Sequence, residues 1–297
     1  GPSAMALLAS YHTDTRSSAF SLHQSSLYIG LMMCGTICAA LLSLFGSWRC
    51  VFIAFGAAGV ILGIVFIFAL KDKESHQDAT SLSAPCVTGA FKAFFCSKKV
   101  LLATTGFVAV VFANNAYLFW APKFLAEKFS VSVAQAGSSA MVAHHTASLA
   151  AILCGGFITD ILVKKMPRSR LLFQVLALLA GAPAIFMIGQ APTVSSAVMM
   201  TLFYGLARGF FEVNTHATVF DFVEEKYRSS TVGFMLFIAF LVGGLSGIIF
   251  AELSERYALK GFEIGFGIMA GAYLLAAILM STLLFRSQSV LKNEKQA

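Results

Sequence analysis

Long apolar runs separated by short polar breaks fill almost the whole chain. Eight of these runs reach the roughly 20 residues that a helix needs to cross a hydrocarbon core. They cover residues 18–45, 50–70, 99–121, 133–163, 171–190, 194–222, 229–251 and 262–285. Residues 1–10 are also apolar and are typical of the end of a ninth span. The pattern therefore predicts an all-α polytopic membrane protein, a bundle of spanning helices.

Composition supports lipid as the solvent of this chain. Hydrophobic residues make up 58% of it, charged residues only 12%, and the mean hydropathy is +0.81. A soluble fold of 297 residues could not cover so much apolar surface. Composition thus excludes an ordinary soluble domain.

The distribution of basic residues explains the net charge of +7. Fifteen of the 21 Lys and Arg fall in alternate breaks and Arg208 lies within a span, whereas only five fall in the breaks between: Arg49, Lys123, Lys128, Arg256 and Lys260. Cytoplasmic loops of membrane proteins carry such an excess. We therefore expect the 71–98 stretch and the C-terminal tail to be cytoplasmic in a cell (inner) membrane, and we expect no nucleic-acid partner.

A short repeat suggests two related halves. The triplet Arg16-Ser17-Ser18 recurs as Arg228-Ser229-Ser230, each time where one apolar run has ended and the next begins. Two pseudo-symmetric halves are typical of transporters, whose binding site lies where the halves meet. If the second half has six spans and the first matches it, the chain begins in helix four of twelve. The predicted divisions are 1–70 (the rest of an incomplete N-terminal bundle), 71–98 (inter-bundle loop), 99–285 (C-terminal six-helix bundle) and 286–297 (tail).

Catalytic and metal-binding motifs are missing from the sequence. There is no HExxH, no P-loop and no nucleophile elbow, and the six cysteines form no CxxC pair. We therefore expect no enzyme activity, no metal site, no cofactor and no disulfide framework.

Arg208 and Glu212 are the most informative polar residues. They lie near the middle of the 194–222 run, four residues apart, and so share a helical face with Tyr204. Charges at mid-membrane are costly and usually functional. In one interpretation Arg208 binds an anionic group of the substrate, while Glu212 is its partner or a proton carrier. In the other, the two residues form a structural ion pair.

Asn114, Asn115 and Tyr117 lie in the middle of the 99–121 run. Amides and an aromatic hydroxyl suit a substrate with hydroxyl or carbonyl groups. Adjacent residues point about 100° apart on a helix, so at most one of the two amides faces a cavity squarely. Hydrogen bonding between helices is the alternative interpretation.

His144 and His145 lie within the 133–163 run. Histidine titrates near neutral pH, so His144 is a candidate for proton coupling and His145 for substrate binding. Polar packing between helices is the alternative. For His23 and Gln24, a similar pair in the first full span, we favour the structural interpretation.

One segment resembles a known family signature. It reads Gly155-Gly156-Phe157-Ile158-Thr159-Asp160-Ile161-Leu162-Val163-Lys164-Lys165. The glycine, the aspartate and the basic pair resemble the cytoplasmic signature after helix eight of the major facilitator superfamily, whose members usually have Arg and Gly where this chain has Ile161 and Val163. The resemblance covers the whole chain as helices four to twelve. It implies two six-helix bundles that rock about a central site, and a gating role for Asp160.

These features together predict a secondary active transporter. We expect it to move a small polar solute, an organic anion or a sugar-like compound, by alternating access coupled to protons. A non-transporting membrane solute sensor on the same scaffold is the alternative. The expected partners are the solute and membrane lipids, and no oligomer is required.

Overall fold

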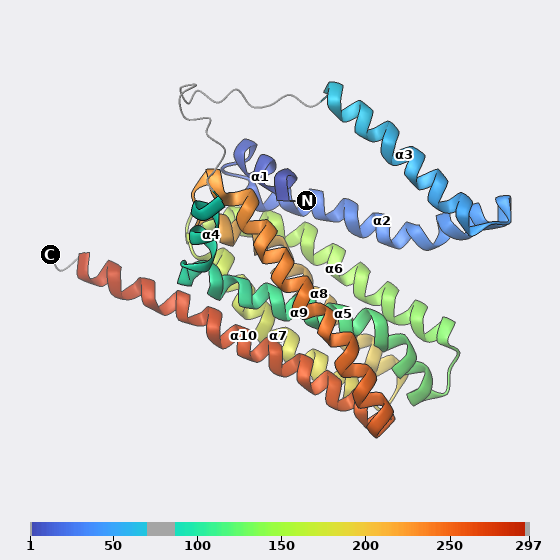
Figure 1. The fold of residues 1–297 in the computed structure, drawn as a ribbon. Helices are drawn as coiled ribbons and strands as arrows, with labels where there is room; N and C mark the ends of the chain where they lie inside the picture. The colour runs from blue at the N-terminus through green and yellow to red at the C-terminus, as the bar shows by residue number, and fades with distance from the viewer. Residues whose placement is uncertain (1, 70–86, 295–297) are drawn as a thin grey trace. The chain divides into compact units, whose positions relative to one another are not determined.

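The computed structural model describes residues 2–69 and 87–294, and all regular structure in these residues is helical (Figure 1). The helices are α1 (Pro2–Tyr11), α2 (Arg16–Phe45), α3 (Trp48–Ala69), α4 (Val87–Phe95), α5 (Lys98–Phe129), α6 (Val133–Val163), α7 (Ser169–Gln190), α8 (Val194–Phe220), α9 (Arg228–Tyr257) and α10 (Leu259–Glu294). A short 3-10 helix, η2 (Glu225–Tyr227), precedes α9.

Seven helices in the described residues are long and apolar enough to cross a membrane. They correspond to the predicted runs from 50–70 onward. The 18–45 run forms α2 and the apolar start of the chain forms α1. The predicted all-α polytopic bundle is therefore confirmed.

The chain divides into two compact units. One comprises residues 1–25 and 85–297, and the other residues 26–84, so the division falls inside α2. Residues 70–86, most of the predicted inter-bundle loop, lie outside the described residues.

In the smaller unit, a tight turn joins α2 to α3. Gly46 follows the last residue of α2, and Trp48 begins α3. The guanidinium of Arg49 lies 4.6 Å from the centre of the Trp48 ring, and the Phe52 ring meets the same indole edge-on at 5.8 Å. Cation–π and edge-to-face contacts of this kind stabilise the first turn of α3.

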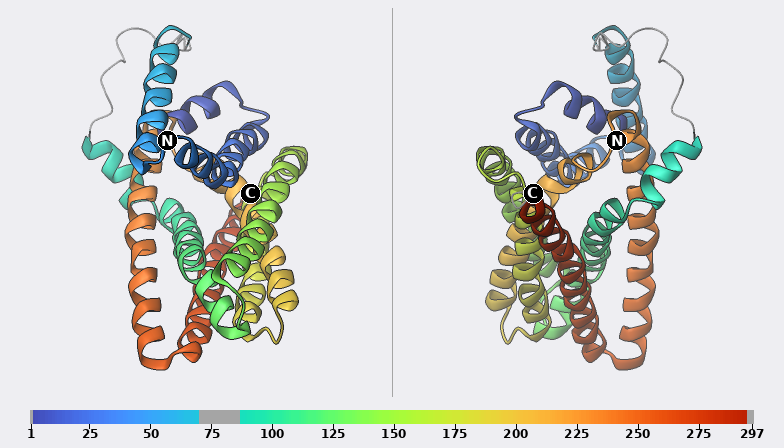
Figure 2. Two further views of the ribbon diagram at one scale, coloured as in Figure 1. Left: turned by 90° about the vertical axis from the view of Figure 1, so that its right-hand side faces the viewer. Right: turned by 90° about the vertical axis from the view of Figure 1, so that its left-hand side faces the viewer.

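The larger unit is built on six long helices, α5 to α10. Figure 2 shows them side by side, and contacts link α6 to α8, α8 to α7, α7 to α10, α10 to α5, and α5 to both α9 and α6. Buried aromatic rings fill one end of the interior: Phe124, Phe250, Phe262 and Phe266. Each of the six helices contributes buried apolar side chains to the interior, as the continuous hydrophobic runs require.

The connection between α9 and α10 is a single residue, Ala258. Its φ is 49° and its ψ −131°, and its backbone N–H donates to the carbonyl oxygen of Ser254 at 3.0 Å. A non-glycine residue rarely adopts positive φ, because its Cβ crowds the backbone. The chain thus reverses direction between two long helices through a single residue.

Close packing of α6 on α8 depends on Gly209. A Cβ added at Gly209 would lie 2.5 Å from the carbonyl oxygen of Ser148 and 2.7 Å from the Cβ of Ala151. Small residues are used in this way to bring membrane helices together. Gly209 is therefore what allows the backbone of α8 to lie against α6 at this level.

Gly209→Val should destabilise the protein by about 1–3 kcal/mol, because the added atoms would force α6 and α8 apart. Thermal unfolding of the purified protein, followed by tryptophan fluorescence, measures the effect. Gly244→Val is the matched control, since a Cβ at Gly244 meets nothing within 4 Å. Equal unfolding temperatures for the two variants would contradict the packing argument.

Candidate functional site

Arg208 and Glu212 form an ion pair on α8, as their spacing predicts. The Nη2 atom of Arg208 lies 3.0 Å from Oε2 of Glu212, and the two side chains are only 11% and 14% exposed. Both charges therefore face protein rather than lipid, which is the arrangement that a mid-membrane charge requires.

A histidine from α6 provides a second contact to the arginine. Nε2 of His144 lies 3.3 Å from Nη1 of Arg208, and the imidazole is completely buried. The His145 ring lies next to it, 5.3 Å away between centroids, and is half-buried. The structure thus brings both predicted histidines to the neighbourhood of the predicted pair.

Two tyrosines line the buried side of His144. The Tyr204 ring stacks on His144 at 4.8 Å, and the Tyr117 ring lies 4.9 Å from it. The Tyr117 hydroxyl is 3.1 Å from Oγ1 of Thr201 on α8 and 3.3 Å from the carbonyl oxygen of Ala140 on α6. Because both tyrosines are completely buried, they connect α5, α6 and α8 behind the Arg208 side chain.

The two adjacent amides on α5 have different surroundings. Asn115 lies against α9, since a Cβ on Gly243 would be 2.9 Å from its Nδ2 atom. Asn114 has a buried Oδ1 with no hydrogen-bond partner. A buried acceptor without a donor is costly, so the Oδ1 atom of Asn114 has hydrogen-bonding capacity that the described residues do not use.

Gln24, for which the sequence favoured a structural interpretation, contacts the predicted pair. Its Nε2 donates to Oε1 of Glu212 at 2.6 Å, so the two carboxylate oxygens of Glu212 have different partners. The spacing of Gln24 seven residues from Ser17, which places both side chains on one face of α2, was the available signal.

Asp160 caps the start of α2. Its Oδ1 accepts from the backbone N–H of Ser17 at 3.1 Å and its Oδ2 from that of Ser18 at 2.7 Å. The first N–H groups of a helix have no partner within the helix, and the helix dipole favours an anion there. Asp160 is buried and also lies 3.5 Å from Nη2 of Arg170.

Further charges extend this contact at the same end of the bundle. Asp221, at the end of α8, pairs with Arg16 at 3.1 Å and with Arg170 at 3.2 Å. Nε of Arg170 also donates to Oγ of Ser17 at 3.1 Å. Two arginines and two aspartates thus hold the start of α2 on α6, α7 and α8.

Replacing Asp160 should loosen the start of α2. Asp160→Ala removes the acceptor of two helix N–H groups and the partner of the Arg170 guanidinium, so amide hydrogen exchange at residues 16–20 should accelerate about tenfold or more. Glu225→Ala is the control, because the Glu225 side chain is 68% exposed. Unchanged exchange in Asp160→Ala would mean that the cap contributes nothing to holding α2.

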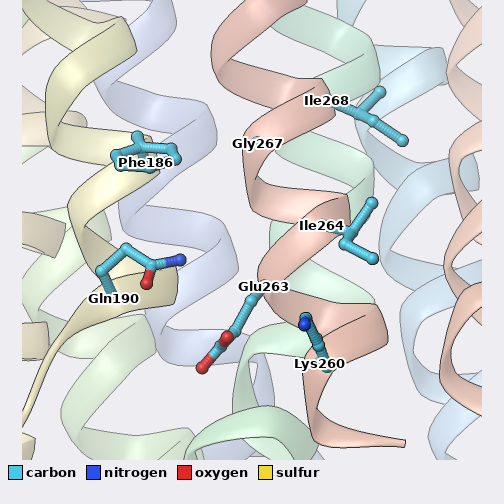
Figure 3. A pocket seen from close by; sticks show the side chains of 7 residues that line it. All are labelled: Phe186, Gln190, Lys260, Glu263, Ile264, Gly267 and Ile268. Carbon is cyan, nitrogen blue, oxygen red and sulfur yellow. The ribbon is translucent and has the colours of Figure 1, made fainter. Parts of the chain in front are cut away.

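A separate pocket of about 520 Å³ lies at the ends of α7 and α10 (Figure 3). Its lining residues are Phe186, Gln190, Lys260, Glu263, Ile264, Gly267 and Ile268. Figure 3 shows Gln190, Lys260 and Glu263 together at one end and Ile268 at the other. Glu263 is already paired with Lys128 of α5 at 2.9 Å. The pocket contains none of the predicted site residues.

Comparison with known proteins identifies the family. The family model described as Major Facilitator Superfamily matches residues 1–249. The chain belongs to this superfamily of membrane transporters, as the signature around Asp160 suggested. No curated protein matches the chain.

A solved structure shows the same fold. The chain is similar to a bacterial homologue of the human lysosomal transporter Spinster, in an inward-facing and unoccupied conformation. The TM-score is 0.61 and the identity 16%, over 93% of this chain and 72% of that one. At this identity the likeness concerns the fold alone.

Proposed function

We propose that this protein is a secondary active transporter that moves a small anionic solute by alternating access, coupled to protons. The observation that carries the proposal is the buried Arg208–Glu212 ion pair, held inside a fold whose family transports solutes. Helices need no such pair to span a membrane, and removing two charges from water is costly. A buried pair that spanning does not require therefore supports a functional role.

The chemistry of the pair supports an anion as substrate. A guanidinium matches carboxylate and phosphate groups because its donors lie in one planar fork. With Glu212 ionised, that fork is occupied; with Glu212 protonated, the charge of Arg208 is free to bind an anion. Protonation of Glu212 and binding of the solute's anionic group at Arg208 would therefore occur together, and this would couple the two fluxes in the same direction.

Other residues take supporting parts in the proposal. His144 and His145 adjoin the pair and are candidates for relaying the proton and contacting the solute. Asn114 offers a hydrogen-bond acceptor to the solute, and Asn115 is its neighbour on α5. The rings of Tyr117 and Tyr204 form the buried wall of the site beside His144. Asp160 closes the gate at the start of α2.

The distribution of Lys and Arg between the two sides supports an orientation in the membrane. We place the protein in the cell (inner) membrane with its C-terminus in the cytoplasm, as one chain in contact with lipids and its solute. A sugar-like solute remains the alternative substrate class, since hydroxyl groups would suit Asn114 and the tyrosines.

Reconstitution tests the proposal directly. The full-length protein is first screened for thermal stabilisation by a panel of small carboxylates, organic phosphates and sugars, because a ligand of the folded state raises the unfolding temperature. Counterflow of the stabilising compound is then measured in proteoliposomes. Counterflow supports a transporter, whereas stabilisation without any flux would favour the sensor.

A further inference from the structure

The two oxygens of the Glu212 carboxylate have separate partners on separate helices. Oε2 contacts Arg208 on α8 at 3.0 Å, and Oε1 accepts from Gln24 on α2 at 2.6 Å. Protonation of Glu212 would affect these contacts differently. An ion pair loses its Coulomb attraction when the carboxylate is neutralised, whereas a hydrogen bond survives if the partner can accept.

Gln24 is able to accept. Its Oε1 is buried and has no hydrogen-bond partner. A primary amide carries both donors and an acceptor, and a half-turn about its last side-chain torsion exchanges the two. After that rotation, the O–H of a protonated Glu212 would donate to Oε1 of Gln24 at the place where the carboxylate now accepts from Nε2.

The residues around Gln24 show that this contact belongs to a continuous seam. Residues 16–25 of α2 present Ser17, Ser21 and Gln24 on one face. A Cβ on Gly156 of α6 would lie 2.5 Å from Oγ of Ser21, and Ser17 is bound by Asp160. Phe20, between them, meets His216 edge-on at 6.0 Å. Gln24 is the end of this seam nearest to Arg208.

From this geometry we infer that Gln24 is a positioning residue that holds α2 on α8 in both protonation states of Glu212, so that protonation frees Arg208 for the solute without releasing α2. This inference rests on the proposed function, in which Glu212 carries the proton. It separates two events: charge exchange at Arg208, and opening of the contact at Asp160.

Several titratable or charged groups surround Glu212 and belong in the test. They are Arg208, Tyr204 and His216 on α8, His145 on α6, Tyr273 on α10, and His23 on α2, which interacts electrostatically with His216. Any of them could contribute a pH effect of its own. Each variant is therefore compared with the same change in a Glu212→Gln background, where Glu212 cannot titrate.

Two substitutions of Gln24 that respond oppositely to protonation of Glu212 test the inference. Gln24→Lys introduces a cation that is attracted to ionised Glu212 and loses this attraction when Glu212 is neutral. Gln24→Glu introduces a carboxylate that repels ionised Glu212 but accepts a hydrogen bond from the O–H of protonated Glu212. Amide hydrogen exchange at residues 16–25 of the full-length protein in lipid nanodiscs is measured at a series of pH values from about 4 to about 8, corrected for intrinsic rates.

The expected results are mirror images. In Gln24→Lys, the amides of residues 16–25 should be protected from exchange at the high end of the pH series and lose about tenfold in protection at the low end. In Gln24→Glu the two results should be reversed. In the wild type these amides should be equally protected at both ends of the series. In Gln24→Met they should lose protection at both ends. In the Glu212→Gln background only the pH dependence contributed by the other titratable groups, including the carboxylate introduced by Gln24→Glu, should remain. Gln190→Lys and Gln190→Glu, at an exposed glutamine of α7, serve as charge-matched controls.

Other outcomes overturn the inference. If Gln24→Lys and Gln24→Glu respond alike to pH, or if Gln24→Met is as protected as the wild type, Gln24 does not hold α2. If the wild type itself loses protection at low pH, the contact does not survive protonation. Failure of the proposed function is a separate result, namely proton-driven uptake that persists in Glu212→Gln.

Discussion

Arg208→Ala should reduce uptake by about a hundredfold or more while the protein still reaches the membrane. The substitution removes the group proposed to bind the anion and leaves the Glu212 carboxylate buried without its cation. Uptake of the compound identified by thermal stabilisation, measured in cells and normalised to the amount of protein in the membrane, is the readout.

The double variant Arg208→Ala/Glu212→Ala distinguishes a functional pair from a structural one. It removes both buried charges, so folding should recover relative to the single variant, since no unpaired charge remains. Uptake should stay lost if Arg208 binds the solute. Recovery of uptake in the double variant would assign the pair to structure alone. Arg256→Ala is the control, because Arg256 pairs with Glu252 on the exposed end of α9.

Glu212→Gln should abolish proton-driven accumulation and retain solute exchange. The amide has the shape of the carboxylic acid and can still hydrogen-bond to Gln24, but it cannot take up or release a proton. The site would therefore remain in the state that binds an anion. Counterflow in proteoliposomes measures exchange, and uptake driven by an imposed pH gradient measures coupling.

The control for this variant is Glu252→Gln. Glu252 also pairs with an arginine four residues away, yet its side chain is 54% exposed, so its neutralisation should leave both measurements unchanged. Undiminished gradient-driven uptake by Glu212→Gln would remove this carboxylate as the proton carrier and direct attention to His144.

The helices and the central ion pair could be predicted from sequence because each depends on local periodicity. A run of 20 apolar residues has few alternatives to a span, as the 50–70 run and α3 illustrate. Likewise Arg208 and Glu212 are four residues apart, so one helix suffices to bring them together. Neither inference requires knowledge of which helix lies beside which.

The remaining site contacts depend on tertiary packing. His144 reaches Arg208 from another helix, 64 residues away, and Gln24 reaches Glu212 across 188 residues. Their composition signals, a histidine pair and an amide in apolar runs, were visible but ambiguous between function and packing. The buried state of Tyr117 also follows from packing, because α6 and α8 cover the α5 face that carries its ring.

The single-residue junction at Ala258 has a consequence for biogenesis. The polar stretch between the two apolar runs, residues 252–261, is helical except at this residue, so little flexible chain separates the spans and we expect α9 and α10 to insert together as one helical hairpin. The junction also has no flexible loop in which a protease could cleave, or in which an epitope tag or a glycan could be placed. Any reporter of topology for this part of the chain has to be attached elsewhere.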